Sequence, residues 1–270
     1  MCLKVLHTIK LSHLVAFNMT VPRIFCNSNL SVQDRLELPP DAARHVQVLR
    51  LQPGSALTLF NGEGGEFESE ILEMTRKDVI VKVIAFKPIE RESTLAVHLA
   101  IGMPANERMD WLVEKSTELG LNKLTPLMTQ HNVVRLNQER GDKKLIHWNS
   151  IASAACSQCG RNRAPLIDTP TSLTPWLKSL PNSDPNLSLR WFFSLEEGAA
   201  PLHNQFERVS SLLTKPARSV LIAFGPEGGW SAQEELLLKD HSFVPLSLGE
   251  RTLRAETAAI ATLAALTLLF

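Results

Sequence analysis

The chain has 270 residues, of which 44% are hydrophobic and 21% charged, and this composition excludes disordered, collagen-like and disulfide-stapled proteins. Its 28 Lys and Arg residues balance its 28 Asp and Glu residues, which excludes a generally basic nucleic-acid coat but leaves room for a local basic face. The length fits one large domain or two modest ones.

Cysteine usage indicates a reducing compartment, so we expect the protein in the cytoplasm. The four cysteines are Cys2, Cys26, Cys156 and Cys159. The last two have the spacing of a metal or redox motif, but no second pair accompanies them and their surroundings read as helical. We interpret them as buried structural thiols. We predict no metal site, because the eight histidines show no ligand spacing either.

Both ends of the chain are apolar without predicting a membrane span. Lys10 and two histidines interrupt the apolar run of residues 1–18, and no small-residue cleavage site follows, so we expect neither a signal peptide nor a span. Residues 255–270 are apolar nearly all round but too few to cross a bilayer comfortably. They predict a buried helix or a subunit contact.

Residues 23–86 are typical of a small β-barrel that one helix interrupts. The expected strands cover residues 55–60, 66–74 and 78–86. Asn61-Gly62 predicts a turn between the first two strands. Asp41 is expected to cap the helix, which should end at about Leu51. The charged segment 87–94 then marks a domain boundary.

Beyond this boundary strands and helices alternate, which predicts an α/β domain with a mainly parallel sheet covered on both faces. The expected strands are 95–101, 124–128, 189–195, 219–224 and 243–248, and the expected helices are 106–119, 142–159, a short one near Trp176 and one after residue 255. Glycine-bearing loops follow the last three strands. Because parallel sheets bind ligands outside the carboxyl ends of their strands, we expect a binding site there.

The loop Gly225-Pro-Glu-Gly-Gly229 is the sharpest local motif. Its glycines permit close approach of the backbone to a ligand, and Glu227 projects from it. Ser231 and Glu234 predict a capping box for the next helix. A tight strand-to-helix turn with glycines for steric reasons explains this fragment, taken by itself, slightly better than a binding role does. The spacing does not fit dinucleotide-binding or P-loop motifs.

A second motif places Arg251, Arg254, Glu256 and Thr257 between an apolar strand and the last apolar helix. Charges beside so hydrophobic an element need pairing. A structural ion pair of Arg254 with Glu256 or Glu227 explains this segment as well as a functional role does. Two such loops after strands of one sheet favour function over structure.

Together these motifs resemble the RsmE family, SPOUT-class methyltransferases that act on uridine in small-subunit ribosomal RNA. The residues that carry the resemblance are Gly225-Pro-Glu-Gly-Gly229 and Leu248-Gly-x-Arg-x-Leu-Arg-x-Glu-Thr257. Further similar pieces occur in the same order at residues 19–25, 45–54, 59–62, 108–111, 114–120 and 154–161.

The resemblance implies a PUA-like, RNA-binding β-barrel over residues 19–90. It implies a SPOUT methyltransferase domain over residues 94–270, an α/β domain whose parallel sheet leads into a C-terminal trefoil knot. It also implies a homodimer. Residues 1–18 precede the family's usual amino terminus, so we expect them to be an unstructured extension.

The resemblance further implies that S-adenosylmethionine is held by three loops, residues 194–198, 225–229 and 246–254. The implied cofactor-binding residues are Ser194, Leu195, Gly225, Glu227, Gly228, Gly229, Leu246, Leu248, Gly249 and Leu253. An apolar slot with few polar contacts is typical of cofactor sites. Without the resemblance, these leucines would be assigned to the core.

The implied reaction is methylation at N3 of a uridine in 16S ribosomal RNA, on the assembled small subunit. That nitrogen carries a proton and is a poor nucleophile until the proton leaves, so a base or a stabiliser of the anion is required. We expect Arg254 to stabilise the uracil anion, and Glu256 or Glu227 to accept the proton or to hold Arg254. Two alternatives remain open: a SPOUT enzyme for a different RNA base, and a non-catalytic ribosome-assembly factor that binds RNA.

Basic residues show a small local surplus in residues 103–163, with nine Lys and Arg against six Asp and Glu. A solvated helix face explains most charges of this kind. We predict RNA phosphate contacts for Arg161 and Arg163, which follow a helix end, and for Arg23 and Arg50 in the first domain.

Overall fold

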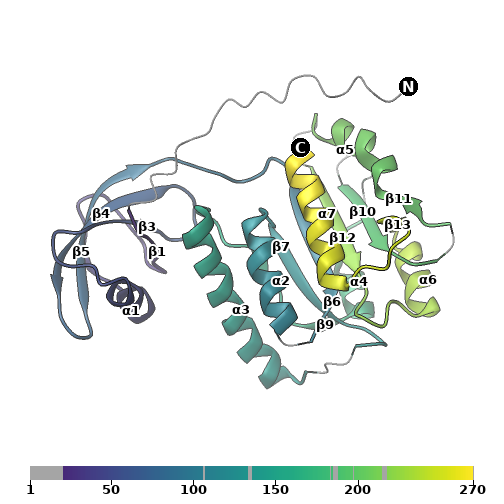
Figure 1. The fold of residues 1–270 in the computed structure, drawn as a ribbon, viewed down its shortest axis with the longest axis horizontal. Helices are drawn as coiled ribbons and strands as arrows, with labels where there is room; N and C mark the ends of the chain where they lie inside the picture. Colours follow the sequence, from purple (N-terminus) through teal and green to yellow (C-terminus); the bar gives the residue numbers. More distant parts are fainter. Residues whose placement is uncertain are drawn as a thin grey trace.

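The chain folds into a β domain followed by a larger α/β domain (Figure 1). The computed structural model describes residues 21–105, 107–132, 136–182, 184, 188–196, 198–214 and 218–269. The predicted extension over residues 1–18 lies outside the described residues. No helix in these ranges is long and apolar enough to cross a membrane.

The first domain is a five-stranded sheet in the order β1-β3-β4-β5-β2. Its strands are β1 (Arg23–Phe25), β2 (Arg35–Glu37), β3 (Ala56–Phe60), β4 (Glu66–Met74) and β5 (Val79–Lys87). On β5 the alternate residues Val79, Val81 and Val83 are buried, which puts one face of the strand in the core. The three predicted strands are confirmed as β3, β4 and β5, whose ends lie within one residue of the predicted ends.

Two local predictions for this domain are wrong. Helix α1 spans Pro40–Val48 and has Pro39 at its N-cap, so Asp41 lies in the first turn and does not cap it. Proline at the first helical position has its φ preset for a helix and lacks an amide hydrogen that would need a partner, so the helix starts two residues earlier than predicted. It ends before Leu51, because Arg50 adopts a positive φ of 57°.

The second domain contains an eight-stranded sheet in which the strand pairings of the described residues are parallel, in agreement with the mainly parallel sheet that was predicted. Its order is β11-β13-β10-β12-β6-β7-β8, and β9 pairs with β7 beyond this path. The strands are β6 (Ala96–Gly102), β7 (Lys123–Met128), β8 (Leu166–Ile167), β9 (Thr171–Ser172), β10 (Ser188–Phe193), β11 (Ala200–Pro201), β12 (Ser219–Phe224) and β13 (Val244–Ser247).

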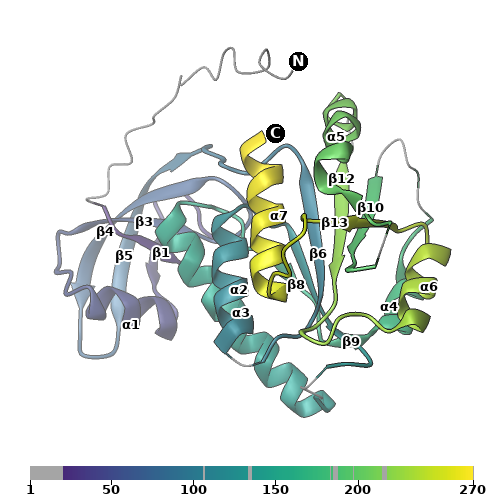
Figure 2. The ribbon, with the colours of Figure 1, turned by 45° about the vertical axis from the view of Figure 1, so that its right-hand side comes forward.

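Helices cover both faces of this sheet (Figures 1 and 2). They are α2 (Glu107–Glu118), α3 (Gln138–Cys159), α4 (Leu173–Ser179), the 3-10 turn η1 (Leu202–Gln205), α5 (Phe206–Leu212), α6 (Ala232–Asp240) and α7 (Ala255–Leu269). Neighbouring strand residues point to opposite faces: Trp191 packs in the core under α2, α3 and α7, whereas Phe192 packs in the core under α4 and α6.

Three helix predictions can be compared with these bounds. The short helix near Trp176 is confirmed as α4. Helix α3 begins at Gln138, four residues before the predicted start, because Asn137 caps it by accepting a hydrogen bond from the Arg140 amide at 3.0 Å. The apolar tail is confirmed as a packed helix: Ala259 and Leu263 of α7 are fully buried.

The cysteines are free thiols in the described part of the chain. Cys26 and Cys156 are buried and Cys159 is partly buried. Burial raises the pKa of Cys156 to about 12, so this thiol stays protonated at neutral pH and is a poor nucleophile. The interpretation as structural thiols therefore fits Cys156.

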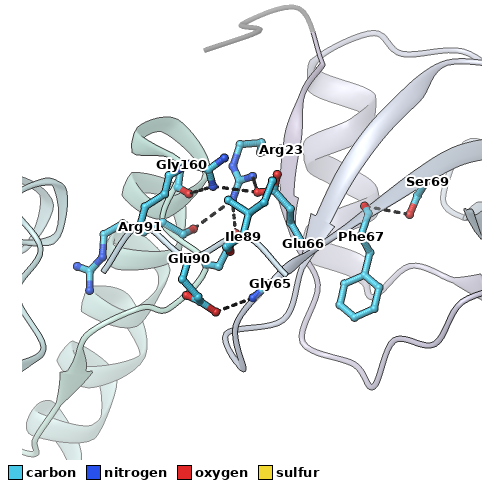
Figure 3. A network of polar contacts seen from close by, with 11 residues as sticks. Arg23, Gly65, Glu66, Phe67, Ser69, Ile89, Glu90, Arg91 and Gly160 are labelled. Atoms are coloured by element: carbon cyan, nitrogen blue, oxygen red, sulfur yellow. Dashed lines mark hydrogen bonds and ion pairs between the residues drawn. The ribbon is translucent and has the colours of Figure 1, made fainter. Parts of the chain in front are cut away.

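A polar joint connects the two domains (Figure 3). Glu66 on β4 accepts a hydrogen bond from Arg23 on β1 at 2.5 Å and another from Arg91, in the interdomain segment, at 3.0 Å. Arg91 also donates to the Gly160 carbonyl at the end of α3, at 2.9 Å. Burial opposes the charge on Glu66, but the hydrogen bonds from the two arginines outweigh it and lower its pKa.

Two of the predicted RNA contacts belong to this joint instead. Arg161 is only 4% exposed; it donates to both carboxylate oxygens of Glu92, at 2.6 and 3.1 Å, and to the Thr117 carbonyl. Arg23 also donates to the side chain of Asn162, at 2.6 Å. Because both side chains are largely buried and their Nη groups bind carboxylate and carbonyl oxygens of the protein, Arg23 and Arg161 are poorly placed to contact phosphates, contrary to the prediction. Arg50 and Arg163 are exposed.

Candidate active site

The glycine-bearing loops meet at the carboxyl edge of the sheet, because β10 lies between β12 and β13. The Ser194 amide donates to the Leu246 carbonyl at 3.1 Å, which ties the first loop to the third. The indole of Trp230 donates to the Phe193 carbonyl at 3.1 Å, which ties the second loop to the end of β10. Three loops distant in sequence thus form one continuous edge.

The loop of residues 225–229 is held rigidly from several sides. A Cβ on Gly225 would lie 2.9 Å from the Gly229 carbonyl carbon, so only glycine fits where the loop folds back on itself. A Cβ on Gly228 would lie 2.7 Å from the side chain of His131. The capping box of Ser231 and Glu234 is confirmed. The steric explanation for these glycines is therefore correct, and it also gives a fixed backbone edge.

The third loop combines a buried strand end with an open turn. Leu246 is fully buried in the core, and Leu248 and Leu253 pack against the same core from partly buried positions. Gly249 has a φ of 98° and open space where a Cβ would be. In the first loop Leu195 is 78% exposed. Apolar side chains and accessible backbone thus alternate along the edge.

Arg108 at the start of α2 connects the two motifs. Its guanidinium lies 3.0 Å from Glu227 of the second loop and 3.8 Å from Glu256 at the start of α7. Glu256 is 6% exposed, and its Oε2 atom has no hydrogen-bond partner among the described residues. A buried carboxylate oxygen left in this state is a strong acceptor for a ligand donor.

The structural ion pair of Arg254 with Glu227 or Glu256, one of the two explanations of this segment, is not formed among the described residues. Within the described residues, Arg108 and not Arg254 pairs with Glu227 and Glu256. Arg254 is exposed and lines a pocket of about 320 Å³. The pocket is lined by Glu107, Arg108, Trp111, Arg254, Glu256 and Thr257. It lies between the first turns of α2 and α7, so the exposed Arg254 and the ion-paired Arg108 share one cavity with the buried carboxylate.

Sequence reasoning missed Arg108 and Trp111 as site residues. Both lie in the segment 108–111 that carries part of the family resemblance, so a signal was present. Their role depends on β6 lying next to β12, a pairing between strands far apart in the chain. Nothing local in the helix sequence reports that adjacency.

The pocket suits a planar polar ligand. It offers a buried acceptor on Glu256, two guanidinium groups as donors, and the indole of Trp111, which is 43% exposed on a helix whose other large apolar residues are buried. Groups of three or more His, Cys, Asp or Glu that could hold a metal ion are absent from the described ranges.

Comparison with known families matches both domains. A model described as an RNA methyltransferase domain matches residues 91–267, and one described as an RNA methyltransferase PUA domain matches residues 38–84. The first match covers more than half of the chain. The α/β domain is therefore of the RNA methyltransferase type, and the β domain is PUA-like.

Individual relatives agree with these matches over nearly the full chain. Ribosomal RNA small subunit methyltransferase E from Buchnera aphidicola subsp. Schizaphis graminum is 30% identical over 93% of this chain and 97% of its own length. The protein of the same name from Rickettsia conorii is 32% identical, over 93% and 97% respectively.

Two solved structures are also similar. Ribosomal RNA small subunit methyltransferase E from Neisseria gonorrhoeae, bound to S-adenosyl methionine, matches with a TM-score of 0.82 and 29% identity, covering 93% of this chain and 98% of its own. A Legionella pneumophila protein in complex with the cofactor SAM matches with a TM-score of 0.82 and 35% identity, covering 92% and 97%. The chain therefore belongs to the RsmE family, the family of ribosomal RNA small subunit methyltransferase E.

Proposed function

We propose that this protein uses S-adenosylmethionine to methylate N3 of a uridine in small-subunit ribosomal RNA, and that its substrate is the assembled small subunit. The observation that carries the proposal is the unpartnered Oε2 atom of buried Glu256, beside Arg108 and Arg254 in one pocket. Uracil presents an N–H donor between two carbonyl acceptors. A carboxylate that shares a pocket with two guanidinium groups offers an acceptor and donors complementary to that edge.

The three loops fit the proposed cofactor. Exposed Leu195 and the partly buried Leu248 and Leu253 give apolar contacts for an adenine ring, and the open turn at Gly249 leaves backbone groups accessible. S-adenosylmethionine supplies, when bound, an activated methyl group on a sulfonium sulfur. The protein's own task is alignment and control of a proton.

The pocket residues divide that task. Glu256 accepts the N3 proton, because its Oε2 is a buried acceptor with no competing donor among the described residues. Arg254 stabilises the negative charge that then spreads over the uracil carbonyls. Arg108 holds Glu227 and Glu256 on one guanidinium and so fixes both carboxylates relative to the second loop.

RNA contacts are proposed for the exposed arginines of the predicted set. Arg50 follows α1 in the PUA-like domain, and Arg163 follows α3 with its side chain 50% exposed. Replacing each by alanine should weaken RNA binding and reduce its dependence on salt concentration, because each phosphate contact releases counterions.

The family resemblance also carries three structural proposals: a trefoil knot at the carboxyl end, association of two copies, and residence in the cytoplasm. The path of the chain supports the first. After β13 the chain crosses back to α7, which packs on α2, β6 and β12 in the middle of the sheet.

The test is methylation of purified small subunits with labelled S-adenosylmethionine, followed by nucleoside analysis. We expect label in 3-methyluridine. Label in another nucleoside would favour the alternative of a different target base. Absence of both transfer and cofactor binding would favour a non-catalytic assembly factor.

The Arg254→Ala variant tests the assignment of the pocket. We expect turnover to fall by about 10²–10³-fold, the usual cost of losing one donor to a developing anion, while affinity for S-adenosylmethionine is retained. Arg208→Ala on α5, also an exposed arginine, serves as the control and should match the unmodified protein. Unchanged turnover in Arg254→Ala would remove this residue from the mechanism.

A further inference from the structure

A buried carboxylate lies beneath the first loop. Glu235 in the first turn of α6 is 5% exposed. Its Oε1 atom accepts a hydrogen bond from the Ser194 hydroxyl at 2.7 Å, and its Oε2 atom has no hydrogen-bond partner among the described residues. Burying a carboxylate costs desolvation free energy. A residue at this position therefore does not serve solubility, and its contact with Ser194 calls for a structural or functional role.

The contact continues from Ser194 into the loop. The Ser194 hydroxyl oxygen accepts a hydrogen bond from the Glu196 amide at 3.0 Å, and the Ser194 amide donates to the Leu246 carbonyl of the third loop. A hydroxyl has one hydrogen to donate, and Ser194 donates it to Glu235. The lone pairs of the Ser194 oxygen are then directed to the Glu196 amide. Glu235 therefore orients the hydroxyl that shapes the turn after β10.

Lys239, one helical turn later on α6, reinforces this arrangement. Its ammonium group lies 3.3 Å from the Glu196 carboxylate and 3.9 Å from that of Glu235. The Glu235 carboxyl thus faces Ser194, Glu196 and Lys239. Burial raises its pKa, and the neighbouring Glu196 carboxylate adds to the rise. Two residues of α6 hold the loop, one through a buried hydrogen bond and the other through an exposed ion pair.

We propose that Glu235 is a positioning residue for the cofactor: through Ser194 it fixes the turn at residues 194–196 that forms one wall of the cofactor site. This inference rests on the proposed binding of S-adenosylmethionine by the three loops. The polar neighbours of the Glu235 carboxyl group in the described chain are Ser194, Glu196 and Lys239, so it acts through the loop.

The test is calorimetric titration of the full chain with S-adenosylmethionine, together with thermal unfolding of each variant. Glu235→Ala and Ser194→Ala should each raise Kd about tenfold, the effect of losing one buried charge-assisted hydrogen bond. The double variant should bind no more weakly than the weaker single one, because both changes break the same link. Glu235→Gln keeps an acceptor for the hydroxyl and should restore most of the affinity.

Leu236→Ala is the matched control, since Leu236 is the next residue of α6 and is 56% exposed. It should bind like the unmodified protein. The inference is wrong if Glu235→Ala binds normally, if Glu235→Gln is as weak as Glu235→Ala, or if the two single effects add. If Glu235→Ala does not fold, Ser194→Ala and Glu235→Gln still decide. Failure of the unmodified protein to bind would instead overturn the proposed cofactor site.

Discussion

His98 on β6 is a partly buried histidine held in a chain of hydrogen bonds. Its Nε2 atom lies 2.7 Å from the Thr125 hydroxyl, which donates its own hydrogen to Asp168 at 2.6 Å. The hydroxyl oxygen therefore accepts from Nε2, and the neutral ring carries its hydrogen there. Burial, aided by the charge of Lys123, lowers the pKa of His98 to about 4.

This lowered pKa predicts a loss of stability in acid. Between pH 6.5 and about 4 the unfolded chain binds a proton at His98 and the folded chain does not. The free energy of unfolding therefore decreases as the pH is lowered through that window. The His98 contribution amounts to at most about 3 kcal/mol. Urea unfolding of the protein and of His98→Gln across this range should give curves that converge toward acid pH.

His147→Gln provides the control for that measurement, because the side chain of His147 is 50% exposed and pairs with Asp110 at the surface. Its curve measures the effect of removing a histidine from the surface. A curve for His98→Gln that runs parallel to that of the unmodified protein would contradict the lowered pKa of His98.

Arg108 and Arg254 illustrate what residue-level reasoning reaches. The motif around Arg254 identified the residue that lines the pocket, because its loop follows a strand of the sheet and carries charge next to an apolar helix. It did not identify the ion-pair partner of Glu227 and Glu256. That partner comes from α2, more than a hundred residues earlier, and is set by sheet order rather than by local sequence.

At the scale of elements, Gly102 sets the distance between β6 and the second loop. A Cβ at Gly102 would lie 2.6 Å from both the nitrogen and the Cδ atom of Pro226 and 3.1 Å from the Gly225 carbonyl carbon. The end of β6 therefore packs directly on the backbone of the loop, and there is no flexible side chain that can move aside.

Gly102→Ala should displace the loop of residues 225–229. We expect a loss of about 1–3 kcal/mol in the free energy of unfolding, as for overpacking in a core, and weaker binding of S-adenosylmethionine. Gly141→Ala is the comparison. Gly141 lies within α3, and a Cβ there would meet Pro170 at an ordinary contact distance of 3.7 Å. Because alanine favours a helix more than glycine does, Gly141→Ala should stabilise the protein by about 0.5–1 kcal/mol. Urea unfolding and cofactor titration measure both, and normal binding by Gly102→Ala would contradict the expected displacement.

Elements were predictable to the degree that their signals are local. Strand β4 matches the prediction at residues 66–74 because apolar and polar residues alternate along it. The starts of α1 and α3 were missed because Pro40 and Asn137 compete with Asp41 and Asp142 as helix-start signals, and the sequence does not rank them. The parallel class of the sheet follows from alternating elements, but its strand order does not, since crossover connections leave no local pattern.

At the scale of the whole molecule, the joint of Glu66, Arg23 and Arg91 sets how the PUA-like domain sits on the α/β domain (Figure 3). These three residues come from β1, β4 and the interdomain segment. The charged segment 87–94 predicted a domain boundary, but no local pattern predicted the joint, so Arg23 was assigned to RNA. The proposed function, with RNA bound by the PUA-like domain and the reaction in the pocket of the α/β domain, requires a fixed angle between the two domains.

Glu66→Ala should loosen this angle, because it leaves two arginines at a partly buried site without their shared carboxylate. We expect a loss of about 1–3 kcal/mol in the free energy of unfolding, faster proteolysis within residues 87–94, and slower methylation of small subunits. Affinity for S-adenosylmethionine should stay unchanged, because β1, β4 and the interdomain segment form the joint, whereas the three loops follow β10, β12 and β13. Glu68→Ala is the control, because Glu68 lies two residues on along β4, 53% exposed in a surface pair with Lys87. If both variants resist protease and methylate subunits alike, then the packing of α3 on β1, rather than Glu66, fixes the two domains.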